Sequence, residues 1–90
     1  MRRIRRTSQF KKDVRRDQKR GKDLGKLKVV IEKLARNEPL EEKYRDHALQ
    51  GRFKGTRECH VEPDWLLIYQ LPPEELVLIR TGTHADLFGE

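Results

Sequence analysis

The most apolar run of the sequence, residues 65–71, follows a Pro-Asp corner at Pro63 and Asp64, and His60 stands just before that corner. Val, Ile, Tyr and Trp favour strands and Pro-Asp favours a turn, so the stretch predicts a strand, a corner and a second strand. His60 and Asp64 then lie on either side of a corner at the rim of a sheet, where rigid scaffolds commonly hold catalytic groups. The alternative is a plain hairpin turn that carries a surface histidine.

The chain before this stretch predicts one short strand and two helices. Residues 3–6 favour a strand, and Thr7 or Ser8 can cap a helix that runs to about residue 20, with Gly21 as its stop. Asp23 can cap a second helix, which Pro39 ends because proline cannot continue a helix. The apolar residues of this helix fall at helical spacing on one stripe: Leu24, Leu27, Ile31, Leu34 and Ala35.

After a connecting segment at 40–51, the hydrophobic period becomes that of strands. Strands are predicted at 52–54, 56–61, 65–71 and 75–81, and residues 83–88 form a short tail. A strand, two helices and then a run of strands indicates an α+β fold, with a helical hairpin packed on one face of a mainly antiparallel, twisted sheet of four to five strands. We expect residues 1–90 to form a single domain.

The charge is unevenly distributed along the chain. Residues 1–36 contain 15 Lys and Arg but 4 Asp and Glu, whereas residues 37–90 contain 6 and 11, and the whole chain has a net charge of +6. So basic a helical half suits a polyanion or an acidic protein partner better than it suits a merely solubilising surface.

The single cysteine and the N-terminus indicate the compartment. Cys59 has no second cysteine to pair with, which fits a reducing cytosol, and it should face inward, opposite to its neighbour His60. No stretch has the apolar core of a signal peptide or the length of a membrane span, so we expect a cytoplasmic protein with no membrane partner.

All three histidines, His47, His60 and His84, border predicted strands in the second half of the chain. Their spacing, with one cysteine, matches no common zinc pattern, so we expect no metal and no other cofactor. Imidazoles beside a basic surface suit acid–base work on RNA, whose 2′-hydroxyl is its own nucleophile. His60, Asp64 and His84 are therefore candidate proton carriers.

Other residues of the same region are candidates for contacts with substrate. Lys54 and Arg57 are candidate cations for the phosphate. Trp65 and Phe88 are candidates for stacking on splayed bases, a contact worth about 1–3 kcal/mol per base. The alternatives are that Trp65 packs in the core and that Phe88 only anchors the tail.

The chain resembles the YafQ-type toxins of the RelE/ParE toxin–antitoxin superfamily over nearly its whole length. The shared pattern comprises Tyr44-Arg-Asp-His47, Leu49-Gln-Gly51, Lys54-Gly55, Arg57, His60-Val-Glu-Pro-Asp-Trp-Leu-Leu-Ile-Tyr69, Arg80-Thr-Gly-Thr-His84 and Leu87-Phe-Gly89. The string His-Val-Glu-Pro-Asp-Trp is far more specific than a lone glycine motif, and the N-terminal residues diverge most.

The resemblance implies a RelE-like fold and a ribosome-dependent mRNA endoribonuclease that cuts mRNA in the A site without a metal. It also implies a cognate antitoxin whose acidic segment wraps the basic surface, and a toxin–antitoxin complex that binds operator DNA through the antitoxin. Catalytic and substrate-contacting positions of the family fall on His47, His60, Asp64, Trp65, His84 and Phe88. We expect His84 to be the general acid, His60 or Asp64 to be the base, and His47 to help hold the phosphate.

Two other functions compete with this one. A non-nucleolytic toxin of the same fold poisons a protein target such as gyrase, but it has no need of His60, Asp64 and His84 together. A plain basic RNA-binding domain has no chemistry at all.

Overall fold

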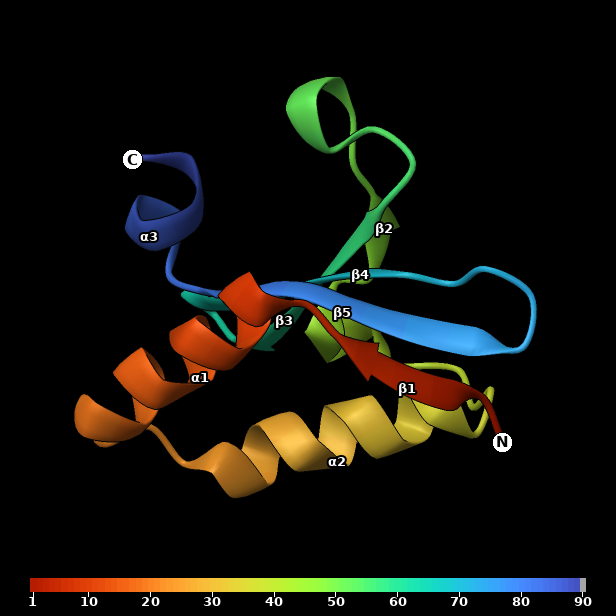
Figure 1. Cartoon of the computed structure of the whole chain (residues 1–90), viewed down its shortest axis with the longest axis horizontal. Helices are drawn as coiled ribbons and strands as arrows, with labels where there is room; N and C mark the ends of the chain where they lie inside the picture. The colour runs from red at the N-terminus through yellow and green to blue at the C-terminus, as the bar shows by residue number, and fades with distance from the viewer. Residues whose placement is uncertain (90) are drawn as a thin grey trace.

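The computed structural model describes residues 1–89, which form a five-stranded sheet with helices on both faces (Figure 1). The strands lie in the order β1-β5-β4-β3-β2. Their bounds are Arg3–Arg6 for β1, His47–Ala48 for β2, Arg57–Glu62 for β3, Trp65–Gln70 for β4 and Glu75–Gly82 for β5. β1 pairs with β5 in parallel and the other three pairs are antiparallel, so the predicted α+β fold with a mainly antiparallel sheet is confirmed.

Helices α1 (Ser8–Lys19) and α2 (Leu24–Ala35) lie on one side of the sheet (Figure 1). Thr7 caps α1, since its hydroxyl accepts the Phe10 N–H at 3.0 Å. Asp23 caps α2 by accepting the Gly25 N–H at 2.9 Å. Both caps were expected, because a short polar side chain satisfies an amide that has no partner within the helix.

The sheet has an apolar cluster on each face. The larger cluster lies under α1 and α2 and consists of Phe10, Leu27, Val30, Leu34, Ala35, Cys59, Val61, Trp65, Leu67, Tyr69, Leu76 and Leu78. The smaller one consists of Leu66, Ile68 and Leu87, with Leu49, Phe53, Ile79 and Phe88 packed against it. β4 supplies alternate residues to both clusters, which explains why its sequence is an unbroken apolar run. The predicted stripe of α2 is correct at Leu27, Leu34 and Ala35 but omitted Val30, which is fully buried.

Two segments differ from the expectation. The predicted strand at 52–54 is wrong: Gly51–Phe53 forms a 3-10 turn, η2, and the edge strand is β2, which pairs with Arg57 and Glu58 of β3. Gly51 has φ +68°, a conformation that suits a turn and that few residues other than glycine adopt. The expected tail folds into a short helix, α3 (His84–Phe88), in which Thr83 and Asp86 cap each other's backbone amides.

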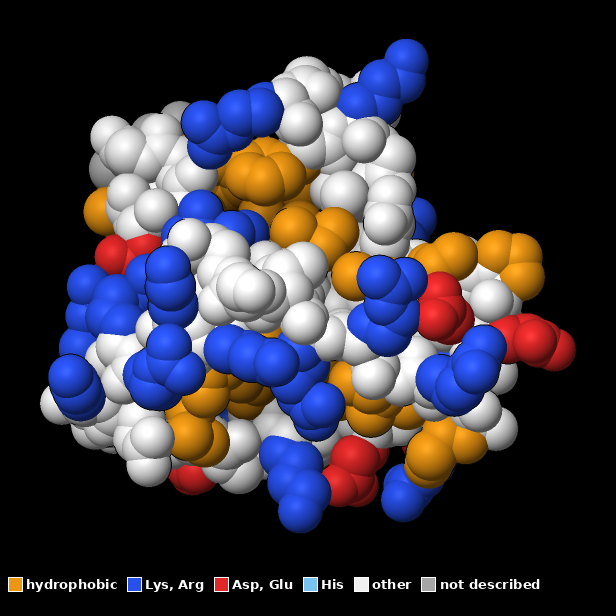
Figure 2. Space-filling model, viewed as in Figure 1, with side chains coloured by type: hydrophobic (Ala, Val, Ile, Leu, Met, Phe, Trp, Pro, Cys, Tyr) orange, Lys and Arg blue, Asp and Glu red, His pale blue; other side chains and the backbone are white. Residues whose placement is uncertain are grey.

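Lys and Arg side chains cover much of the face that carries α1 and α2 (Figure 2). Few acidic side chains interrupt them in this view, as the charge count of the first 36 residues predicts. Within residues 1–89, no helix combines the length and the apolar character that crossing a bilayer requires.

Candidate active site

Three segments that are far apart in the sequence bring the histidines together. The ring centroid of His60, on β3, is 5.8 Å from that of His84 at the start of α3 and 6.4 Å from that of His47 on β2. The sheet topology accounts for this, because strands β2 and β3 are neighbours and β5 leads straight into α3. The three imidazoles therefore converge at one rim of the sheet.

Asp64, in the corner between β3 and β4, holds His84 at two points. Its Oδ1 accepts the His84 backbone N–H at 2.9 Å and lies 2.5 Å from the ring Nδ1. The backbone hydrogen bond, followed by the ring hydrogen bond, lowers the pKa of the Asp64 carboxyl below its ordinary value. Asp64 is thus an ionised carboxylate that fixes the orientation of His84.

Glu58 lies beside two of the histidines and was not among the predicted site residues. Its side chain is buried, with Oε2 3.3 Å from His47 Nε2 and Oε1 3.8 Å from His60 Nε2. The available signal was strand alternation, because residues 58 and 60 of one strand share a face. The site therefore contains a buried carboxyl group within reach of two imidazoles.

The acceptors around the rings assign their tautomers. His47 Nδ1 lies 2.7 Å from the Arg45 carbonyl oxygen, and His60 Nδ1 lies 3.2 Å from the Pro63 carbonyl oxygen. A carbonyl oxygen only accepts, so both Nδ1 atoms carry the hydrogen. His84 Nδ1 donates likewise to ionised Asp64. Since Nδ1 is engaged in all three rings, Nε2 is the nitrogen that can exchange a proton, and in His47 and His60 it lies beside the Glu58 carboxylate.

Glu58, His60 and His84 are also near enough to share an ion. One ligand atom from each lies within 4.8 Å of the other two. Imidazole nitrogen and carboxylate oxygen are ordinary ligands for zinc and copper, so the donor set fits such an ion. The same atoms are the ones that proton transfer to and from RNA would use.

The prediction that Trp65 stacks on an RNA base is wrong. Its side chain is 0% exposed, and its indole N–H donates to the Thr81 hydroxyl at 3.0 Å. A ring with no exposed surface cannot stack on a base. Phe88, by contrast, is half-buried and packs edge-to-face on Phe53 with the centroids 5.7 Å apart, so part of its surface is open.

The two predicted cations lie in different surroundings. Arg57 is on the side of β3 opposite to Glu58 and His60, and its Nε donates to Asp46 at 3.2 Å. The structure therefore does not bring Arg57 to the histidines. Lys54 is exposed in the segment after η2, and its ammonium has no partner within residues 1–89.

A network of ion pairs fixes the helix that carries His84. Asp86 of α3 accepts from Arg20 of α1 at 2.7 and 3.1 Å, and Arg16 lies 3.4 Å from the same carboxylate. The Arg20 hydrogen bond, against a smaller effect of burial, holds the pKa of Asp86 well below its usual range. Arg16 also donates to the Thr81 carbonyl oxygen at 2.7 Å. Helix α1 thereby sets the position of α3.

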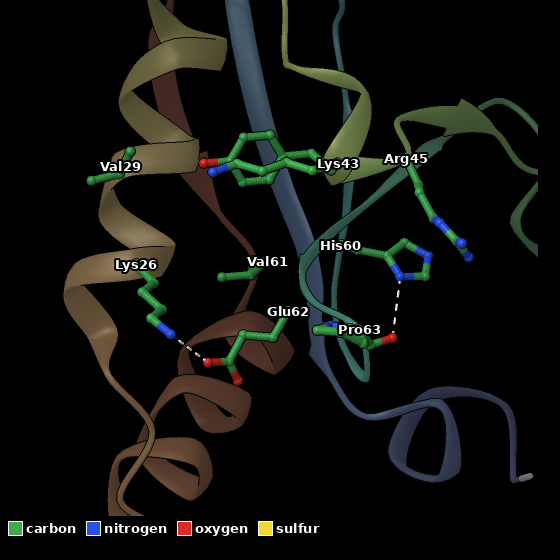
Figure 3. Close-up of a pocket in the computed structure, with 9 residues that line it drawn as sticks. Lys26, Val29, Lys43, Arg45, His60, Val61, Glu62 and Pro63 are labelled. Carbon is green, nitrogen blue, oxygen red and sulfur yellow. Dashed lines mark hydrogen bonds and ion pairs between the residues drawn. The ribbon is translucent and has the colours of Figure 1, made fainter.

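An open groove of about 740 Å³ begins beside His60 (Figure 3). Lys26 and Val29 of α2 line one side and Lys43 lines the other, whereas the side chains of His60 and Arg45, at the edge of the groove, point away from α2. The end of β3 lies between them, and Tyr44 completes the wall. None of the predicted site residues except His60 lines this groove.

The sequence matches the family described as "Bacterial toxin of type II toxin-antitoxin system, YafQ" over residues 2–89. It is 54% identical over 84 residues to the mRNA interferase toxin YafQ of Escherichia coli K12, an alignment that covers 92% of this chain and 91% of that relative.

Solved structures agree with the sequence comparison. The E. coli DinJ–YafQ complex has a chain 52% identical to this one, with a TM-score of 0.92 over 99% of this chain and all of that one. A metal-bound toxin from Helicobacter pylori is 43% identical, with a TM-score of 0.91 over 98% of this chain and all of that one. With the family match, the sequence identity and the fold in agreement, this chain belongs to the YafQ family of toxins of bacterial type II toxin–antitoxin systems.

Proposed function

We infer that this protein is an endoribonuclease toxin that cleaves translated mRNA at the histidine cluster. The observation that carries this proposal is the pairing of His84 with Asp64, opposite His60 at 5.8 Å between ring centroids. Attack by a ribose 2′-hydroxyl requires one imidazole that accepts a proton and a second, protonated imidazole that donates one, and we assign these roles to His60 and His84. The name of the E. coli relative, an mRNA interferase toxin, supports the same reaction.

His60 and His84 divide the proton transfers. His60 Nε2 takes the proton from the 2′-hydroxyl, whose oxygen attacks the adjacent phosphorus. His84 donates a proton to the departing 5′-oxygen, so a 2′,3′-cyclic phosphate and a free 5′-hydroxyl result. We assign the base to His60 rather than to Asp64, because hydrogen bonds from His84 lower the pKa of Asp64 and make its carboxylate a weaker base. Its role is to orient His84.

His47 is the third group at the scissile phosphate, held by the Arg45 carbonyl oxygen and beside Glu58. Phe88 and Lys54, both partly or fully exposed, supply contacts to the RNA. The reaction needs no resident metal, since the side chains account for both proton transfers.

The ribosome supplies the alignment of the RNA. An in-line attack needs a splayed mRNA, and such alignment is worth about 7–11 kcal/mol of barrier, whereas one acid–base group gives only about 10²–10⁴-fold. A chain of 90 residues gains this alignment by binding mRNA in the A site. The Lys and Arg of residues 1–36 then contact rRNA phosphates, and ribosome affinity falls steeply as salt rises, because phosphate contacts release counterions.

A cognate antitoxin silences the toxin in the bacterial cytoplasm. The E. coli relative is solved in complex with DinJ, and an acidic antitoxin segment suits the basic face of α1 and α2 (Figure 2). The complex binds operator DNA through the antitoxin.

The test compares a translated mRNA with the same mRNA free of ribosomes, each incubated with purified toxin. Primer extension should locate cuts inside the reading frame only when ribosomes are present, and the fragments should carry 5′-hydroxyl and 2′,3′-cyclic phosphate ends. Intact mRNA together with broken DNA in arrested cells would instead indicate a toxin that poisons gyrase. Cutting at equal rates without ribosomes would remove the proposed role of the A site.

A further inference from the structure

The groove beside His60 is accessible because the sheet edge ends there. β2 pairs with β3 only at Arg57 and Glu58, so no strand covers the edge of β3 from Cys59 onward within residues 1–89. Helix α2 and the 3-10 turn η1 (Glu42–Tyr44) form the two walls (Figure 3). Its volume of about 740 Å³ is within the range of about 300–1,000 Å³ for pockets that enclose a small ligand.

The groove combines unpaired cations with apolar surface. Among residues 1–89, Lys43 and Arg45 have no ion-pair partner, whereas Lys26 is held 2.8 Å from Glu62. Val29 is 49% exposed on the α2 wall and adds aliphatic surface to the groove. Tyr44 presents a half-buried ring with the Lys43 ammonium 5.2 Å from its centroid. A nucleotide has a flat base and a phosphate. The Tyr44 ring and the Val29 side chain suit the base, and the cations of Lys43 and Arg45 suit the phosphate.

We propose that this groove binds the mRNA nucleotide on the 5′ side of the cut, with its base against Tyr44 and Val29 and its 5′ phosphate near Lys43 and Arg45. The inference rests on the proposed function, which makes His60 the base toward the 2′-hydroxyl. The nucleotide that carries this hydroxyl must lie on the His60 side of the cluster. The nucleotide that leaves lies on the His84 side, towards α3 and Phe88.

The assignment also gives the RNA an aromatic surface next to the cut. Trp65 is buried and cannot stack, so Tyr44 and Phe88 are the aromatic side chains adjoining opposite sides of the cluster. The RNA then follows a path from η1 past His60 and His84 to α3. Base preference at the 5′ position depends on Tyr44 and Val29.

The kinetic test uses two matched substitutions of exposed apolar residues. Val29→Glu puts a negative charge in the groove, and Leu71→Glu makes the same change at the far end of β4, where Leu71 is 38% exposed. Val29→Glu should raise KM for programmed ribosomes about fivefold or more with kcat within twofold, and Leu71→Glu should change neither. Tyr44→Leu should raise KM to a similar extent and Tyr44→Phe should restore it, because a phenylalanine ring still stacks. Equal KM values for Val29→Glu, Leu71→Glu and the wild type would overturn the proposal.

The positional test uses an mRNA with a single 4-thio-2′-O-methyluridine on the 5′ side of the cut, where the methyl group blocks attack. Irradiation on programmed ribosomes should crosslink this base to the peptide of Tyr44 or of Val29, and a probe on the 3′ side to α3. A 5′ probe that crosslinks to α3 would overturn the groove assignment while wild-type cleavage upholds the nuclease. Wild-type toxin that cuts no mRNA would instead contradict the proposed function itself. Loss of antitoxin affinity in Val29→Glu with an unchanged KM would assign the groove to the antitoxin.

Discussion

The two faces of the sheet differ in how much apolar surface they bury and in what they carry. The face under α1 and α2 has twelve buried residues in one cluster. The face under α3 has three, and the histidines and Glu58 lie at its rim. Stability therefore comes chiefly from the face under α1 and α2. The face under α3 has a smaller apolar cluster and leaves polar groups open to a substrate. The comparison predicts that substitutions on the two faces have separable effects on folding and on cleavage.

The largest effect is expected for His84→Gln. Loss of the general acid should lower the cleavage rate about 10²–10⁴-fold, because one proton-transfer group contributes that much. His84 is partly exposed at the start of α3, so the midpoint of thermal unfolding should stay near that of the wild type. Cleavage at the wild-type rate, or a protein that has lost its fold, would contradict the role given to His84. Asp64→Asn is the companion variant, and its cleavage rate should lie between those of the wild type and of His84→Gln.

Adjacent residues of β4 allow a direct comparison of the faces. Leu67 and Leu66 are both 0% exposed, but Leu67 belongs to the large cluster and Leu66 to the small one. Leu67→Ala should lower the free energy of unfolding by about 2–5 kcal/mol, and Leu66→Ala should lie at the low end of that range, because a thin layer relaxes more easily around a cavity.

The loss of cleavage activity should rank the two leucine variants in the opposite order to their loss of stability. Under conditions where both are folded, Leu66→Ala should lose more cleavage than Leu67→Ala, since Leu66 lies in the cluster that supports α3. Denaturant unfolding and single-turnover cleavage measure the two quantities. Equal losses in both assays would show that the faces are not separable.

A smaller effect is expected for Asp86→Asn, which weakens the link between α1 and α3. Hydrogen bonds to charged groups contribute about 1.5–3 kcal/mol each when buried, and this site is partly solvated, so we expect a loss of about 1–2 kcal/mol at pH 7. The pKa of Asp86 is lowered by folding, so its contribution is complete above the unfolded value of about 3.9 and disappears as the pH falls below it.

The difference in unfolding free energy between wild type and Asp86→Asn should therefore shrink below pH 4. Asp17, whose pKa burial raises, acts in the opposite direction, and because the Asp86 charge adds to this rise, Asp86→Asn removes only a small part of it. A difference that stays constant from pH 7 to pH 3 would mean that the charge of Asp86 does not stabilise the link.

The elements with strong periodicity could be predicted from the sequence, and the short ones could not. Helices α1 and α2 and strands β3 to β5 repeat apolar residues at the helix or strand period over many positions. β2 has two residues and α3 has five, too few to show a period, so both were missed. These elements exist because of tertiary contacts, such as the Arg52 hydrogen bond to the Leu87 carbonyl oxygen at 3.0 Å.

The site shows the same division. His47, His60, Asp64 and His84 are titratable and border strands, so their type and position pointed to the rim. Glu58 escaped notice because a glutamate in a strand is usually solvated, whereas here the neighbouring β2 and the rings of His47 and His60 lie beside it. The burial of Trp65 depends on contacts between distant segments, including the hydroxyl of Thr81. The types of these residues indicated where the chemistry takes place, whereas only the fold shows which of their side chains are exposed.

Removal of metal ions should have the smallest effect. Toxin dialysed against EDTA and assayed with ribosomes in Mg²⁺ buffer free of transition metals should cleave within about twofold of the untreated rate, because two imidazoles already supply both proton transfers. The same Nε2 atoms of His60 and His84, with Glu58, form a set that would fit zinc or copper. A loss of cleavage that added zinc restores would therefore make these residues ligands of a required ion. It would also transfer the activation of the 2′-hydroxyl from His60 to the metal, and the catalytic face would no longer act through side chains alone.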